Sequence, residues 1–128
     1  MKRLTEKVKK FVLERDWDKQ EPDQIAKSIA IEAAELLELF QWANPTAKEI
    51  KENTAKLQEL KGELADVLIY CSQLGLLLDL DLDKIVEEKL ALAARKYPAK
   101  LMRLRSAGES LANRKYLEIK KKYRQKRE

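Results

Sequence analysis

Two pairs of acidic residues lie inside otherwise apolar segments of this 128-residue chain. Glu32 and Glu35 fall within IEAAELLELFQW, and Glu63 and Asp66 fall within GELADVLIY. The members of each pair are three residues apart, and residues at that spacing share one face of a helix. If the two segments are helices that pack antiparallel, all four carboxyl groups converge on one partly buried place. Any fold of this sequence must explain how these acids are tolerated together.

Such a cluster is strongly unfavourable without compensation, because like charges at short range in poorly solvated surroundings repel and force protonation. A hard divalent cation, most simply Mg²⁺, takes oxygen ligands and can in turn hold phosphates. The competing interpretation is that these residues are exposed charges on amphipathic helices, as most Glu residues are. Glu38 continues the same spacing, but a solvated position explains it equally well, so it is not counted among the site residues. The second pair favours the metal site, because Gly62 directly precedes Glu63 and the apolar run VLIY follows Asp66.

The composition predicts a single all-α domain. Hydrophobic residues make up 45 % of the chain, Gly and Pro number three each, and Leu, Ala, Glu and Lys, all good helix formers, are abundant. The chain contains no His, which excludes Ser-His-Asp triads, Cys-His nucleophiles and His-ligated zinc. Any catalysis must therefore rest on carboxylates, Lys, Tyr or a metal ion.

The sequence also indicates a cytoplasmic protein that does not enter a membrane. Cys71 is the single cysteine, so no disulfide framework exists and a reducing compartment fits. The N-terminal segment spaces charges throughout and does not read as a signal peptide. The most apolar region, residues 64–78, is too short and too polar to cross a bilayer.

Hydrophobic periodicity predicts helices at residues 4–15, 22–42, 55–78 and 82–96. Thr46 and Glu49 form a capping-box pattern that predicts the start of a further helix. We expect a four-helix core with a C-terminal helical appendage. Because residues 55–78 are apolar on more than one face, we also expect self-association into a homodimer or homotetramer.

The positive charge belongs to the C-terminal end of the chain. Residues 1–98 carry 16 Lys and Arg against 19 Asp and Glu, whereas residues 99–128 carry 11 against 3, which together give the net charge of +5. We therefore predict a main domain at residues 1–100 and a basic tail at residues 101–128. Tyr116 and Tyr123 alternate with Lys and Arg in this tail, which leaves a non-enzymatic helical module that binds nucleic acid or another partner as an alternative function. In the competing interpretation Tyr116 docks on the protein.

Four motifs in this order resemble the MazG-like, all-α nucleoside triphosphate pyrophosphatase superfamily. They are ERDW at residues 14–17, EAAELLELFQW, GELADVLIY, and KYP at residues 96–98. The resemblance covers residues 8–100 and is closest to the dCTP pyrophosphatase-like branch. It implies an Mg²⁺-dependent nucleoside triphosphate pyrophosphohydrolase that cuts between the α and β phosphorus atoms and serves nucleotide-pool sanitising or dCTP-type housekeeping.

The same resemblance assigns roles to individual residues and argues against nucleic acid as a partner. It implies that Glu32, Glu35, Glu63 and Asp66 hold Mg²⁺ and carry out catalysis, with a nucleoside triphosphate as the substrate. Relatives usually carry Asn at the position of Ala93. Some relatives also carry His near the position of Val8. Both departures affect the expected base preference rather than the acidic cluster.

Five further residues are candidates for substrate binding. Trp17 and Trp42 match aromatic positions that lie near the nucleobase in the family, and Lys89 and Lys96 match basic residues directed at the triphosphate. Tyr70 follows the acidic pair by one helical turn, where its ring can stack on a base. The alternatives are that the two Trp side chains only close the core and that the two Lys side chains lie on solvated helix faces.

Overall fold

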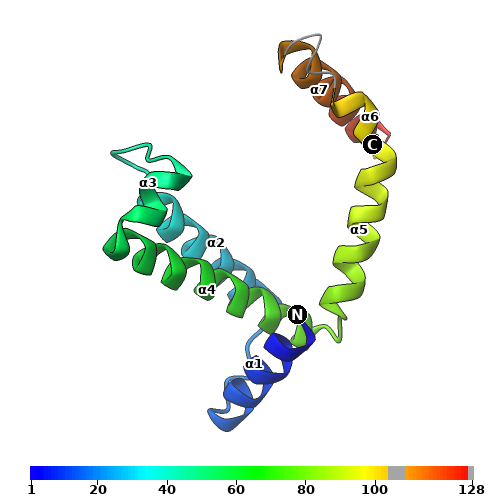
Figure 1. Cartoon of the computed structure of the whole chain (residues 1–128). Helices are drawn as coiled ribbons and strands as arrows, with labels where there is room; N and C mark the ends of the chain where they lie inside the picture. Colours follow the sequence, from blue (N-terminus) through cyan, green and yellow to red (C-terminus); the bar gives the residue numbers. More distant parts are fainter. Residues whose placement is uncertain (104–108, 127–128) are drawn as a thin grey trace. The chain divides into compact units, whose positions relative to one another are not determined.

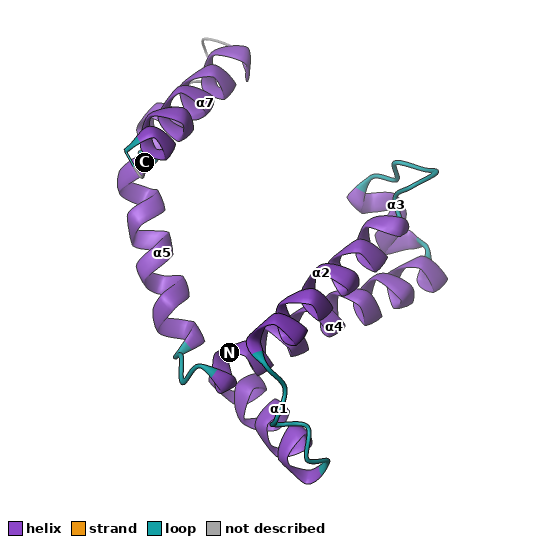
Figure 2. Cartoon of the chain, turned by 180° about the vertical axis from the view of Figure 1, so that it is seen from behind, coloured by secondary structure: helices purple, strands orange, loops and turns teal. Residues whose placement is uncertain are grey.

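The computed structural model describes residues 1–103 and 109–126, and this part of the chain contains helices and loops but no strand (Figure 2). The prediction of an all-α fold is confirmed. Contacts divide the chain into two compact units, Met1–Leu82 and Asp83–Glu128. No helix within the described residues combines the length and the apolar content needed to cross a membrane.

The first unit is built around α2 (Pro22–Glu38) and α4 (Thr54–Leu77). These two helices lie side by side and antiparallel (Figure 1), while α1 (Lys2–Glu14) packs on α4 and the short α3 (Ala47–Glu52) connects α2 to α4. The antiparallel arrangement is the one required to bring the two acidic pairs together. The acidic residues of α2 and α4 therefore lie on facing sides of the two helices.

Local capping explains where α2 and α3 begin. Pro22 occupies the first turn of α2, and the Glu21 backbone N–H donates to Gln24 Oε1 at 2.9 Å. Thr46 Oγ1 accepts the Glu49 backbone N–H at 3.2 Å, which confirms the predicted helix start. One predicted bound was wrong: α2 ends at Glu38, not near residue 42, because residues 39–42 turn toward the Asn-Pro pair at residues 44–45.

The hydrophobic core of the described residues is small. Buried hydrophobic side chains are Val8 and Val12 from α1 and Ile25 from α2. Large apolar side chains remain exposed, for example Leu37, whose side chain is 70 % exposed. Where exposed apolar side chains form a contiguous patch, the patch is typical of an interaction site. The predicted self-association stays a prediction that this surface motivates.

The second unit contains most of α5 (Leu82–Lys96), the short α6 (Ala99–Met102) and α7 (Glu109–Gln125). The rings of Tyr97 and Tyr116 stack with centroids 4.8 Å apart, so α7 docks beside the end of α5. Lys96 Nζ lies 4.8 Å from the centroid of the Tyr123 ring. Tyr116 therefore makes a docking contact, as one interpretation of the tail expected. The predicted domain boundary near residue 100 stays a prediction.

Candidate metal centre between α2 and α4

Three carboxylates from two helices meet in the first unit. Oxygen atoms of Glu32 on α2 and of Glu63 and Asp66 on α4 all lie within 4.8 Å of one another. The i,i+3 spacing places Glu63 and Asp66 on one face of α4, and the antiparallel packing turns that face toward α2. The predicted convergence of acidic residues from the two helices is thus present.

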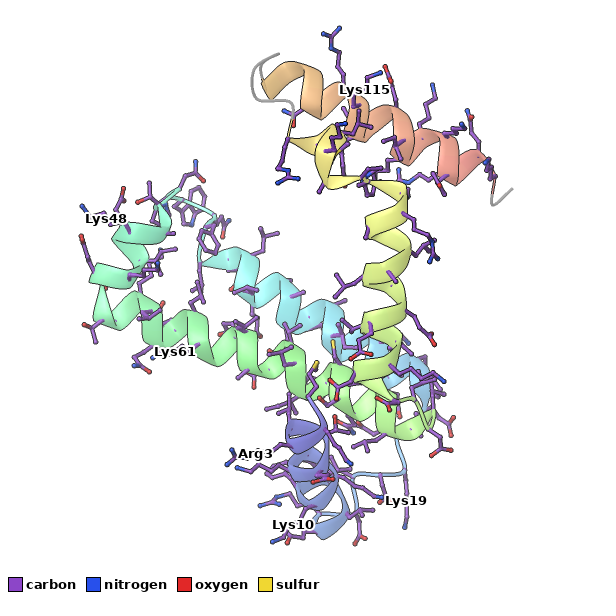
Figure 3. The ribbon with its side chains drawn as sticks, turned by 45° about the vertical axis from the view of Figure 1, so that its right-hand side comes forward. Arg3, Lys10, Lys19, Lys48, Lys61 and Lys115 are labelled. Carbon is purple, nitrogen blue, oxygen red and sulfur yellow. The ribbon has the colours of Figure 1, made fainter. Side chains whose placement is uncertain are left out.

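The cluster holds carboxylate oxygens that the protein leaves unpaired. Glu32 Oε2 and Glu63 Oε2 are shielded from solvent and have no hydrogen-bond partner among the described residues. Lys61 points away from α2 (Figure 3), as expected for a residue about 200° around the helix from Glu63. A buried carboxylate oxygen without a partner is unfavourable. A positively charged ligand next to Glu32 Oε2 and Glu63 Oε2 would offset this cost.

Both Glu side chains resist ionisation. Burial, the largest cause, raises the pKa of Glu32 above its ordinary value of 4.5, and the neighbouring Glu35 carboxyl and the charges of Asp66 and Glu63 raise it further. Burial likewise raises the pKa of Glu63, followed by the Glu35 carboxyl and the charges of Asp66 and Glu38. A bound cation would reverse this effect, because positive charge favours the ionised forms.

Glu35 joins the cluster from a more exposed position. Its side chain is exposed, yet its carboxyl lies near enough to raise the pKa of both Glu32 and Glu63. Glu38 also acts on Glu63, as the weakest of the causes. Glu38 is not among the predicted site residues, although its i,i+3 spacing after Glu35 is a signal that links it to the site.

The size of the cluster fits a small hard cation. Mg²⁺ takes oxygen ligands at about 2.1 Å, so two ligands on opposite sides of the ion lie roughly 4.2 Å apart. The oxygens here lie within 4.8 Å of one another, a separation similar to that of ligands around such an ion. All the donors are carboxylate oxygens, which hard divalent cations prefer.

The aromatic candidates lie in different parts of the first unit. Tyr70 is half-buried and lies one turn beyond Asp66 on α4. The Trp17 side chain is 54 % exposed and meets the Phe11 ring edge-on, with centroids 5.7 Å apart. Trp42 is 89 % exposed in the loop after α2. Neither Trp is buried in the core of the described residues, and the role of both at a nucleobase stays a prediction.

A cavity of about 360 Å³ lies next to Trp17. Periodicity and motifs do not predict this cavity, because its walls come from separate segments of the chain. Its lining includes Val12, Leu13, Trp17, Ile25, Gln73 and Leu80. The cavity belongs to the first unit and shares helix α4 with the acidic cluster.

The two basic candidates belong to the second unit. Lys89 is exposed on α5. Lys96 ends α5 and lies over the Tyr97 ring, with Nζ 5.1 Å from the centroid. This contact gives Lys96 a local aromatic partner. The roles of both residues at a triphosphate stay predictions.

Comparison with known proteins identifies the family. The sequence pattern of the MazG-like family matches residues 27–106, which include both acidic pairs. The chain belongs to the MazG-like family. This membership confirms the resemblance seen in the sequence motifs.

Two individual relatives are similar to this chain. The chain is 37 % identical to dCTP pyrophosphatase 1 of Homo sapiens over 115 residues, which cover 85 % of this chain and 61 % of that protein. It therefore spans less than two thirds of that relative's length. The crystal structure of a pyrophosphatase from Archaeoglobus fulgidus is similar with a TM-score of 0.66 and 35 % identity, covering 77 % of this chain and 92 % of the other. The MazG-like helical fold thus extends over most of the chain.

Proposed function

We propose that this MazG-like chain is a nucleoside triphosphate pyrophosphohydrolase that converts a (d)NTP and water to a (d)NMP and diphosphate. The strongest support is the cluster of carboxylates formed by Glu32, Glu63 and Asp66. Two buried oxygens of this cluster, one from Glu32 and one from Glu63, have no hydrogen-bond partner among the described residues. The printed names of two relatives, a dCTP pyrophosphatase and a pyrophosphatase, point to the same reaction.

Mg²⁺ is the proposed cofactor, and its ligands would come from Glu32, Glu35, Glu63 and Asp66. Bound there, it would neutralise phosphate oxygens and lower the pKa of the attacking water. The chain lacks His, so one of the four carboxylates accepts the proton that the water loses. Glu35 shares the cluster while remaining exposed, and this position suits contact with an incoming substrate.

Two kinds of side chain are proposed to contact the substrate. Trp17, Trp42 and Tyr70 offer flat rings on which a nucleobase can stack, and each such contact contributes about 1 to 3 kcal/mol. Lys89 and Lys96 supply point charges that suit a triphosphate. Removal of damaged, modified or surplus dNTPs from the nucleotide pool is the proposed biological role, with a dCTP-type substrate as the first to test.

The working form is a homodimer or homotetramer. The described part of one chain buries few large apolar side chains and leaves Leu37 on α2 and Leu90 on α5 exposed by 70 % and 63 %. Covering such side chains with another copy of the chain removes apolar surface from water, which is favourable at about 25 cal/mol per Å². Assembly would therefore bury apolar side chains that a single chain leaves exposed.

The test is a pyrophosphate-release assay of the full chain with a panel of dNTPs and NTPs. We expect release with Mg²⁺, loss of release with EDTA, and recovery when Mg²⁺ is added back. Glu35→Gln and Asp66→Asn should abolish release, and Glu52→Gln is the matched control. Activity that survives EDTA or both substitutions would contradict the proposal.

A further inference from the structure

The loop that joins α1 to α2 (teal in Figure 2) is tied to α4 by one buried amide. Gln73 Nε2 donates to the backbone oxygen of Trp17 at 3.3 Å and to Gln20 Oε1 at 2.9 Å. Gln73 is only 8 % exposed. A buried amide needs such partners, and both acceptors of Gln73 Nε2 belong to the loop that carries Trp17.

The backbone of Trp17 is held on its other side by α1. Its N–H donates to Val12 O at 3.0 Å, and the Asp16 N–H donates to Leu13 O at 3.2 Å. Asp16 has a φ of 54°, so these bonds form the left-handed turn that often closes a helix. Residue 17 is therefore hydrogen-bonded to α1 through its N–H and to α4 through its C=O.

The Trp17 side chain stays available despite this fixed backbone. It is about half exposed and touches Phe11 with an edge-to-face geometry. An aromatic ring on a fixed backbone can receive a flat ligand without the entropy cost of ordering its loop.

Gln73 shares its helix with two members of the acidic cluster. It follows Asp66 by seven residues, which is about two helical turns and roughly 10 Å along α4 on nearly the same face. We propose that Gln73 is a positioning residue that fixes Trp17 at a set distance from the carboxylates, so that one substrate reaches both. This inference rests on the proposed function, in which Trp17 stacks on the base and the carboxylates serve the phosphates.

Gln73→Met tests the inference, because methionine has a similar length and volume but no amide donor. Ser72→Ala is the matched control: Ser72 is fully buried on the same helix, and its Oγ has no hydrogen-bond partner among the described residues. Pyrophosphate assays should show that Gln73→Met raises KM for the preferred nucleotide about fivefold and changes kcat less than twofold. Ser72→Ala should leave both constants unchanged.

A second readout does not depend on activity. The chain has two tryptophans, so in a Trp42→Phe background all tryptophan fluorescence comes from Trp17. Without nucleotide, Gln73→Met should increase acrylamide quenching of Trp17, and Ser72→Ala should not. Gln20→Ala removes the other partner of Gln73 from an exposed position and should change quenching in the same direction, which keeps the test open if Gln73→Met folds poorly.

The results separate this inference from the proposed function. Unchanged quenching in Gln73→Met and Gln20→Ala would show that the amide does not hold the loop and would overturn the inference. Increased quenching with an unchanged KM would overturn it too, because the loop would then be held without effect on the substrate. If the parent protein releases no pyrophosphate from any nucleotide, the proposed function is wrong, and Gln73 cannot position Trp17 for that reaction. The quenching measurement still shows whether Gln73 holds the loop.

Discussion

Glu32 on α2 and Glu63 on α4 bring carboxylate oxygens within 4.8 Å of each other, and each side chain has one shielded oxygen without a hydrogen-bond partner among the described residues. Two ionised carboxylates in this arrangement repel each other and have lost solvation. A divalent cation relieves both effects. The stability of the protein should therefore report on the cation directly.

Glu63→Gln should stabilise the metal-free protein and remove its response to Mg²⁺. The amide carries no charge, so it does not repel the Glu32 carboxylate. It also removes one of the negative charges that would attract the cation. Thermal unfolding in EDTA and in Mg²⁺ measures both effects, and pyrophosphate release should fall at least about 100-fold, since the metal supplies several kcal/mol of transition-state stabilisation.

Glu52→Gln is the control for this substitution. Glu52 lies in α3 and forms an exposed ion pair with Lys48 at 3.9 Å. Exposed pairs contribute little, so the Mg²⁺ response should remain. An equal rise in Tm on adding Mg²⁺ to the parent and to Glu63→Gln would contradict a metal site at Glu63.

The stability of the metal-free protein should fall as pH rises through the raised pKa values of Glu32 and Glu63. Their pKa values in the folded protein lie above the ordinary 4.5, so the folded state binds these protons more tightly than the unfolded state. The resulting stabilisation is complete below pH 4.5 and is lost as pH passes the raised values. Denaturant titrations in EDTA across this range measure the trend.

A Glu32→Gln, Glu63→Gln double variant isolates the contribution of these two carboxyls. The difference between the parent and this variant should grow with pH in EDTA and shrink when Mg²⁺ is present. A difference that does not depend on pH would mean that the two carboxyls titrate as they do in the unfolded chain.

Trp17→Ala should weaken nucleotide binding by about 5- to 150-fold, since stacking on one base contributes about 1 to 3 kcal/mol. Trp17→Phe keeps a smaller ring and should lose less. Calorimetric titration with a non-hydrolysable nucleotide in Mg²⁺ measures this affinity. Equal affinity in the parent and in Trp17→Ala would remove Trp17 from the base site.

The sequence was sufficient to predict the helices and the convergence of the acids, because both depend on local periodicity. The positions of Glu32 and Glu63 follow from an i,i+3 spacing on two long apolar segments. The contact between Gln73 and Trp17 could not be predicted in this way. It joins residues 56 apart in sequence, and the turn that presents Trp17 has Asp16, not glycine, at its left-handed position.

The end of α2 is a second feature that local periodicity does not predict. Helical periodicity continues through Phe40, yet the helix stops at Glu38. The Phe40 N–H bonds to Leu37 O three residues back, so the chain tightens before the Asn-Pro pair. Trp42 consequently sits in a loop, exposed, and not on the inner face of a helix.

The exposed apolar side chains lead to a prediction about assembly. One chain has a mass of 14.9 kDa, and light scattering after gel filtration should give about two or four times that value, because the exposed apolar surface is favourable to bury. Leu37→Asp places a charge where Leu37 is now 70 % exposed and should shift the protein toward monomer. Gln41→Asp adds the same charge at an exposed polar position and should leave the mass unchanged. A monomeric parent protein, or an unchanged mass for Leu37→Asp, would show that another surface or another partner covers α2.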